Sequence, residues 1–253
     1  MLLSSEDVAL VTGAAQGIGK GIARLLAAEG ARVAVADLNG ELAKKVAGEI
    51  SAETGREALG LALDIRSEAE IETAVDALQA RFGTPTILVN NAGLYLNKPL
   101  LDTTREAFER VLAVNVTGTF LMTRALGRLM VKARRGRIVN IASCSARKAD
   151  PGQVAYNASK SAIVGLTRVA ALEFGPSNVT CNAVLPGATD TEMIRSTFLN
   201  SPEVERQWIE RTALKRLGRP EDVARVVLFL CSSLADHVTG ESVVVSAGEL
   251  MTQ

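Results

Sequence analysis

Seven short aliphatic segments, separated by longer amphipathic ones, constrain the fold of this chain most strongly. The short segments are rich in valine, isoleucine, leucine and alanine, as buried strands are. They lie at 8–11, 32–36, 58–63, 87–90, 137–141, 179–185 and 242–246. Helical spacing of apolar residues occupies 17–29, 40–54, 67–82, 104–132, 154–174 and 220–230. Strands that alternate with helices predict an α/β fold: a doubly wound, mostly parallel, seven-stranded Rossmann-type sheet with helices on both faces.

The domain organisation is predicted to be simple. At 253 residues, without a repeat or a linker, the chain is expected to form a single domain over 1–253. Residues 187–218 break the alternation, because they are long, lack a strand and mix Met193, Phe198 and Trp208 with polar residues. Long segments of this kind are often functional, so we expect a substrate lid here. A decorative insertion is the alternative.

Composition excludes several classes of function. The 28 basic and 28 acidic residues balance to zero, which disfavours nucleic acid or an anionic membrane as a partner. No apolar run approaches the ~20 residues of a membrane helix, and the amino terminus does not resemble a secretory signal. We therefore expect a cytoplasmic protein.

Cysteine and histidine are too sparse for several kinds of site. Cys144, Cys181 and Cys231 are far apart and odd in number, which indicates neither a disulfide framework nor a metal site. His237 is the only histidine, so a Ser-His-Asp mechanism would depend on it. Its position in a predicted loop favours an exposed side chain instead.

A glycine-rich turn, Thr-Gly-Ala-Ala-Gln-Gly-Ile-Gly at 12–19, joins the first strand to the first helix. Glycines at such a turn let backbone amides approach a pyrophosphate at the positive end of the helix. An acid, Asp37, follows about 20 residues later at the end of the second strand, as a dinucleotide site requires. Its carboxylate can accept hydrogen bonds from ribose hydroxyls and would repel a 2′-phosphate, which favours NAD over NADP. Alternatively, Asp37 only caps the next helix.

Tyr156 and Lys160 are four residues apart in a predicted helix, so they share one face. A phenol titrates near ~10, and a cation within roughly 4–6 Å lowers that pKa. The pair could bring a phenol's proton within reach of neutral pH. By itself the spacing is weak evidence, because tyrosines near lysines are common.

Taken together, these motifs resemble the short-chain dehydrogenase/reductase family over nearly the whole chain. The turn matches the family's Thr-Gly-x-x-x-Gly-x-Gly, and Asn-Asn-Ala-Gly at 90–93 ends the fourth strand. Ser143 ends the fifth strand, thirteen residues before Tyr156, and Pro-Gly at 186–187 ends the sixth. After the last strand the family usually carries an Asp-Gly-Gly-like turn, whereas this chain has Ser-Ala-Gly-Glu at 246–249.

The resemblance implies a role for each catalytic position. Tyr156 would be the general acid/base. Lys160 would hold the nicotinamide ribose hydroxyls and, with the cationic oxidised nicotinamide, lower the Tyr156 pKa. Ser143 would orient the substrate oxygen, and Asn115 would anchor a water that links Lys160 to solvent. For Asn115 a helix hydrogen bond, and for Ser143 a strand-end cap, are the alternatives. The positions implied to bind the dinucleotide, with Tyr156 and Lys160, are Gly13, Gln16, Gly17, Ile18, Gly19, Asp37, Leu38, Asp64, Ile65, Asn91, Ala92, Gly93, Pro186, Gly187, Thr189 and Thr191.

The sequence thus predicts an NAD-dependent alcohol dehydrogenase or carbonyl reductase acting on a small molecule. The expected substrate pocket comprises Tyr95, Ser145, Gln153 and Met193, with Phe198 and Trp208 on the lid. Arg147 and Lys148 either receive an anionic substrate tail or lie in a solvated loop. A homotetramer built on the two long helices is expected. An NAD-using lyase or epimerase and a non-catalytic dinucleotide sensor remain open on this fold.

Overall fold

Seven parallel strands form one sheet in the computed structural model, which describes residues 1–197 and 201–251. The sheet order is β3-β2-β1-β4-β5-β6-β7. The strands are β1 (Val8–Thr12), β2 (Arg32–Asp37), β3 (Ala58–Ala62), β4 (Ile87–Asn90), β5 (Gly136–Ile141), β6 (Val179–Pro186) and β7 (Ser242–Val245). Each predicted strand agrees with the observed one to within one residue at either end. The predicted doubly wound fold is confirmed.

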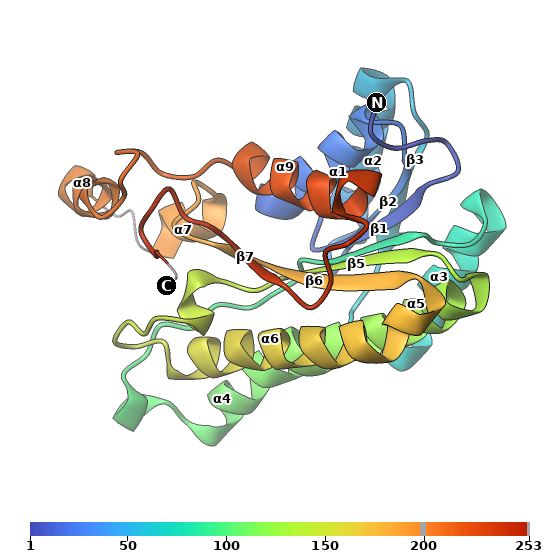
Figure 1. The fold of residues 1–253 in the computed structure, drawn as a ribbon. Coiled ribbons are helices and arrows are strands. Elements are labelled where there is room, and N and C mark those ends of the chain that lie inside the picture. Colours follow the sequence, from blue (N-terminus) through green and yellow to red (C-terminus); the bar gives the residue numbers. More distant parts are fainter. Residues whose placement is uncertain (198–200, 252–253) are drawn as a thin grey trace.

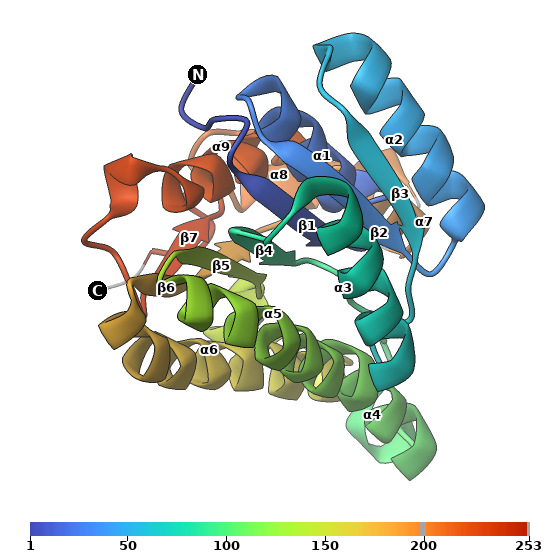
Figure 2. The ribbon, with the colours of Figure 1, turned by 90° about the vertical axis from the view of Figure 1, so that its right-hand side faces the viewer.

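Helices cover both faces of the sheet (Figures 1 and 2). One face carries α1 (Gly17–Ala28), α2 (Gly40–Thr54) and α9 (Pro220–Cys231), and the other carries α3 (Glu68–Phe82), α5 (Thr119–Ala133) and α6 (Val154–Phe174). Side chains of a strand alternate between the faces. In β1, Ala9 and Val11 pack in the core under α1 and α9, whereas Val8 and Leu10 pack in the core over α3, α5 and α6.

The helix predicted over 104–132 is interrupted. It consists of α4 (Arg105–Leu112), a π-helical turn η2 (Ala113–Gly118) and α5. The π turn contains the buried Asn115 and ends where Gly118 meets Ile65 so closely that a Cβ would lie 2.5 Å from the Ile65 side chain. A π turn inserts an extra residue into a helix and is frequent at functional sites.

The segment after β6 is helical rather than a plain loop. It contains α7 (Glu192–Thr197) and α8 (Pro202–Glu210), which lie beyond the carboxyl edge of the sheet (Figure 1). Its two ends are tied together, since Asp190 N donates to Gly218 O at 2.8 Å and Gly218 N to Ala188 O at 2.9 Å. Phe198, predicted on the lid, lies outside the described residues.

Five short elements complete the chain: the 3₁₀ turns η1 (Leu100–Asp102), η3 (Cys144–Ala146), η4 (Gly175–Ser177) and η5 (Ser233–Ala235), together with η2. Among the described residues, no helix combines the length and hydropathy needed to cross a membrane.

Candidate active site

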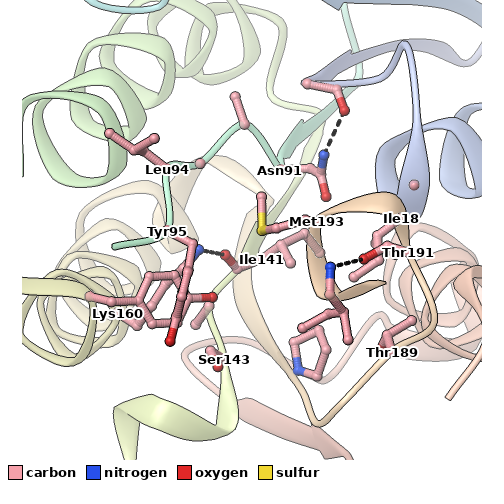
Figure 3. A pocket seen from close by; sticks show the side chains of 18 of the residues that line it. Ile18, Asn91, Leu94, Tyr95, Ile141, Ser143, Lys160, Thr189, Thr191 and Met193 are labelled. Atoms are coloured by element: carbon pink, nitrogen blue, oxygen red, sulfur yellow. Dashed lines mark hydrogen bonds between the residues drawn. The ribbon is translucent and has the colours of Figure 1, made fainter. Parts of the chain in front are cut away.

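A cavity of about 520 Å³ opens at the carboxyl edge of the sheet. Residues that follow β1, β2, β4, β5 and β6 line it, which is where open parallel sheets bind ligands. In Figure 3, Ile18, Thr189 and Thr191 lie across the cavity from Tyr95 and Lys160. Of the predicted site residues, all but Gly19 and Asn115 line this one cavity.

The glycine turn forms one end of the cavity. Gly17 has φ +55°, in the left-handed region that favours glycine. Gly19 lies behind the turn, where a Cβ would be only 2.3 Å from the carbonyl oxygen of Gly13. Asn91 locks the turn from the end of β4, since its Nδ2 donates to Thr12 O at 3.0 Å and to Gly13 O at 2.9 Å.

The first amides of α1 are available to an anion. The residue before the helix, Gln16, gives no side-chain cap, and the first turn of α1 carries no acidic residue. Uncapped helix amides and the positive helix end together favour a phosphate. The turn therefore fits the pyrophosphate of a dinucleotide.

Asp37 presents its carboxylate beside this turn. Oδ2 accepts from Ala15 N at 3.1 Å and Oδ1 accepts from Asn39 N at 3.0 Å. Because a carboxylate has about four acceptor positions, both oxygens can still accept a hydroxyl. The alternative that Asp37 is only a helix cap is wrong, since Asn39 caps α2 by accepting from Leu42 N.

A second carboxylate lies further along the same edge. Asp64 accepts from Arg66 Nε at 2.9 and 3.0 Å, and these hydrogen bonds with the guanidinium lower the pKa of Asp64. Ile65 and Arg66 line the cavity next to it. Arg66 was not predicted, because an arginine two residues beyond a strand resembles any surface residue.

Thr189 and Thr191 line the cavity after β6. Thr189 Oγ1 donates to Gly187 O at 3.1 Å, and Thr191 Oγ1 accepts from Ile194 N at 3.4 Å in the first turn of α7. The first bond ties Thr189 to the residue after β6, and the second caps the start of α7.

Tyr156 and Lys160 lie on α6 and face the cavity with Ser143. Lys160 Nζ is 5.5 Å from the centre of the Tyr156 ring and donates to Ile141 O at 2.8 Å. Burial lowers the pKa of Lys160 to about 8. It raises the pKa of Tyr156 to about 12, although a hydrogen bond with Ser143 acts in the opposite direction.

In the protein alone, Lys160 does not lower the pKa of Tyr156, and the lowering expected together with the oxidised nicotinamide stays a prediction. Part of the Tyr156 surface faces the cavity, but burial disfavours the phenolate more than the hydrogen bond with Ser143 favours it. The same burial disfavours the ammonium of Lys160, whose hydrogen bond goes to a carbonyl rather than to the phenol.

Asn115 clamps the loop after β4 to α6. Its Oδ1 accepts from Leu94 N at 2.7 Å, and its Nδ2 donates to Leu94 O and to Ser159 Oγ, both at 2.9 Å. The side chain is completely buried and lies next to Lys160 rather than in the cavity wall. The water predicted to be anchored there stays a prediction.

The predicted substrate residues gather at the opposite end from the glycine turn. The rings of Tyr95 and Tyr156 meet edge to face at 4.9 Å, and Ser145 Oγ donates to Gln153 Oε1 at 3.0 Å. Met193 and, from α8, Trp208 also line the cavity. Ser143 also caps η3 by accepting from Ser145 N at 3.1 Å, so the predicted cap and the cavity position coexist.

Comparison with known proteins agrees with this geometry. Residues 13–249 match the family model described as enoyl-(acyl carrier protein) reductase. The chain is 43% identical to the 3-oxoacyl-[acyl-carrier-protein] reductase FabG of Aquifex aeolicus, over 95% of this chain and 96% of that protein. It is 37% identical to a sorbitol dehydrogenase of Cereibacter sphaeroides, over 96% and 97%. A putative short-chain alcohol dehydrogenase from Sinorhizobium meliloti superposes with a TM-score of 0.93 at 35% identity, covering 98% and 97%.

The chain belongs to the short-chain dehydrogenase/reductase family. Membership makes it an oxidoreductase that uses a nicotinamide dinucleotide. The named relatives act on acyl carrier protein substrates in one case and on a polyol in another. Family membership therefore does not identify the substrate, which has to be inferred from the residues that line the cavity.

The histidine, the cysteines and Arg147 complete the list of candidate groups in this short-chain dehydrogenase. His237 is exposed in a turn after η5 and does not line the cavity, as expected. The three cysteines are buried with free thiols, and burial raises the pKa of Cys144, beside the serine, to about 11. Arg147 does not line the cavity either, so the predicted anionic tail loses one of its two partners.

Several residues of the cavity wall had no assigned role. Among them are Arg66, Leu94, Arg110, Asp150, Glu192 and Glu249. One sequence feature could have pointed to Glu249, because it is the last residue of the turn in which this chain differs from the pattern usual in short-chain dehydrogenases.

Proposed function

We propose that this protein is an NAD-dependent alcohol dehydrogenase or carbonyl reductase of the cytoplasm, which interconverts a secondary alcohol and a ketone. One observation carries the proposal. Ser143, Tyr156 and Lys160 line the same cavity as the uncapped glycine turn and Asp37. A phenol that exchanges a proton is thereby placed in the same space as a site for a dinucleotide.

The residues present fit that dinucleotide. The glycine turn at 13–19 would hold the pyrophosphate, and Asp37 the hydroxyls of the adenosine ribose. Asp64 and Ile65 would flank the adenine, whereas Thr189 and Thr191 would contact the nicotinamide amide and the phosphates. The carboxylate of Asp37 supports NAD rather than NADP, since a 2′-phosphate would meet like charge there.

When bound, the coenzyme supplies the acceptor or donor of a hydride. The protein supplies a path for the proton and orients the substrate. In alcohol oxidation, the Tyr156 phenolate takes the proton from the substrate hydroxyl and becomes the neutral phenol, while Ser143 holds the substrate oxygen by a hydrogen bond. Lys160 places positive charge beside the phenol, and a second cation in the cavity would offset the cost of forming the phenolate.

We further propose that the segment 187–218 is the substrate lid. Its ends are joined through Thr189 and Gly218, so α7 and α8 can move as one flap over the cavity. Met193 and Trp208, which line the cavity, lie on this flap.

Replacing Tyr156 tests the proposed function. In Tyr156→Phe, we expect turnover of a panel of alcohols and ketones to fall about 10²- to 10⁴-fold, because a positioned acid/base contributes that much. NADH binding, measured by fluorescence, should be retained. NADH absorbance measures turnover. A lyase or epimerase would give no net NADH with any substrate, and a sensor would give no turnover at all.

The chain offers a matched control in Tyr95, its only other tyrosine, which also lines the cavity. Tyr95→Phe removes the same hydroxyl without removing the acid/base, so its loss should stay under about tenfold. Equal losses in the two variants would contradict the role given to Tyr156.

Replacing Asp37 tests the coenzyme. In Asp37→Ala, the ratio of kcat/KM with NAD to that with NADP should fall by about tenfold or more, because the repulsion of a 2′-phosphate disappears. Steady-state kinetics with each coenzyme measures the ratio. An unchanged ratio would refute the assignment of NAD.

A further inference from the structure

The substrate end of the cavity contains a buried carboxylate with one unused oxygen. The side chain of Glu249 is only 3% exposed. Its Oε1 pairs with Lys148 Nζ, and its Oε2 has no hydrogen-bond partner in the part of the chain that the structure describes. Leaving a buried acceptor without a partner costs about 1–3 kcal/mol or more of folding free energy. An unpaired buried oxygen therefore indicates a ligand or requires another explanation.

The backbone turns this side chain inward. Between β7 and Glu249, Ala247 has φ +54° and Gly248 has φ +81°. The left-handed region is strained for alanine, and strain of this kind gathers at ligand sites. Ala213 N and Leu214 N hold the turn in place by donating to Ala247 O at 2.8 and 3.2 Å.

The unused oxygen lies against the end of β6. A Cβ added to Gly187 would be only 2.8 Å from Glu249 Oε2, so glycine is the residue that leaves room for it. Gly187 and Glu249 both line the cavity. Cys144, next to Ser143, is close enough that the charge of Glu249 contributes to raising its pKa. The carboxylate is thus near the reacting end of the cavity.

Charges around Glu249 are balanced. Lys148 Nζ is also 3.6 Å from Asp150, and Arg211 reaches Asp150 at 3.3 Å and Glu249 at 3.8 Å. The cluster therefore holds two cations and two carboxylates. Both cations also lie over the Trp208 ring, at 5.6 and 4.6 Å from its centre, which fixes the cluster to α8.

These observations constrain the ligand. An anionic substrate tail would have to compete for Lys148, because this lysine already forms ion pairs with Asp150 and with Glu249. An aliphatic chain would remove water from four charged groups and return no hydrogen bond. A neutral hydroxyl can donate to Oε2 without disturbing the charge balance.

We propose that Glu249 forms a second hydroxyl subsite and that the substrate is a small diol or polyol. The hydroxyl that reacts lies at Ser143 and Tyr156, and another hydroxyl of the same molecule donates to Glu249 Oε2. This inference rests on the proposed alcohol dehydrogenase function and names the substrate class for that site.

A series on one carbon skeleton tests the subsite. The probes are pentan-2-ol and the pentane-2,3-, 2,4- and 1,4-diols, assayed by NADH formation. At least one diol should exceed pentan-2-ol in kcat/KM by about tenfold or more, because a site built for a hydroxyl rejects an analogue that lacks it. Equal values across the series overturn the proposal.

Variants show whether Glu249 causes the preference. In Glu249→Gln the ratio of diol to pentan-2-ol should fall by about tenfold, since a hydrogen bond to a charged acceptor is lost. The double variant Lys148→Met with Glu249→Met removes a cation and a carboxylate together, so it keeps the charge balance and should abolish the preference. The control is Glu241→Gln, an exposed carboxylate on the same terminal segment, which should keep the ratio. A ratio unchanged in both Glu249 variants overturns the proposal.

Two further measurements separate other outcomes. If 4-aminopentan-2-ol is preferred to every diol, the subsite binds ammonium and the hydroxyl assignment is wrong. If no alcohol is turned over, the proposed function fails, and the subsite is judged by calorimetry alone. Titration of the same alcohols into Tyr156→Phe saturated with NAD⁺ should show tighter binding of a diol than of pentan-2-ol, and equal dissociation constants overturn the subsite.

Discussion

At the scale of single residues, burial acts on both members of the Tyr156–Lys160 pair. Burial disfavours the charged form of each side chain. It lowers the pKa of the lysine to about 8 and raises that of the tyrosine to about 12. Burial in the protein alone thus shifts both groups towards their neutral forms, although a lysine with a pKa of about 8 still carries its charge at pH 7. Ligands that bring charge into the cavity are expected to shift this balance.

The lysine also affects stability. Because the pKa of Lys160 is lowered from 10.5 to about 8 in the folded state, the unfolded chain binds more protons between those pH values. Lys160 should therefore contribute a rise in the free energy of unfolding from pH 8 towards pH 10, by up to about 3 kcal/mol if the full shift is realised. The three buried cysteines act in the opposite direction above pH 9, as Tyr156 does above pH 10, because burial raises their pKa values.

Lys160→Met should remove this rise and increase the free energy of unfolding at pH 7, while activity is lost. Urea denaturation at pH 7 and at pH 9.5 measures both effects. The matched control is Lys132→Met on the exposed surface of α5, whose pH dependence should match that of the wild type. If the difference in stability between the wild type and Lys160→Met is the same at both pH values, the lowered pKa is wrong.

At the scale of elements, the glycine turn shows how close packing makes a binding surface. Gly19 leaves no space for a Cβ, because the Gly13 carbonyl and Asn91 Nδ2 would lie at 2.3 and 2.5 Å. The hydrogen bond between Asn91 Nδ2 and the Gly13 carbonyl holds the turn in place. A displacement of either group would therefore move the backbone amides that are proposed to bind the pyrophosphate.

Gly19→Ala should therefore weaken NADH binding by about tenfold or more and lower stability by roughly 1–3 kcal/mol, as overpacking does. Fluorescence titration and denaturation measure the two effects. Gly48→Ala is the matched control, since nothing lies within 4 Å of its Cβ in α2. It should leave binding unchanged and raise stability by up to about 1 kcal/mol. Equal effects of the two substitutions would show that Gly19 is not needed for close approach.

At the scale of the whole molecule, α5 and α6 carry apolar side chains that the chain itself does not cover. Phe120 is 46% exposed, Val169 55% and Leu172 80%. Helices α5 and α6 lie side by side on the outer layer of one face (Figures 1 and 2). We propose that this surface joins copies of the chain in a tetramer.

Leu172→Glu should lower the mass of the assembly, because a charge placed in an apolar interface is desolvated without a partner. Analytical ultracentrifugation measures the mass. Leu2→Glu, at an exposed leucine near the amino terminus, is the control and should keep the wild-type mass. A monomeric wild-type protein would contradict the proposed tetramer.

The sequence by itself determined the strands, the helices, the glycine turn and the spacing of Tyr156 and Lys160. These features are local: the strand period of two, the helical period of 3.6 and a turn that requires glycine are all written within a few neighbouring residues. The parallel order of the sheet follows from them, because crossovers have one hand. The position of the π turn within 104–132 and the helices α7 and α8 could not be read from this periodicity.

The tertiary structure decided what depends on residues that are far apart in the chain. It joined Glu249 to Lys148, 101 residues away, and left one carboxylate oxygen unused beside Gly187. It also set the direction of the Tyr156 pKa, which the neighbouring lysine alone would have lowered. Burial and charge balance are sums over every group within a few ångströms, and no local pattern contains those groups.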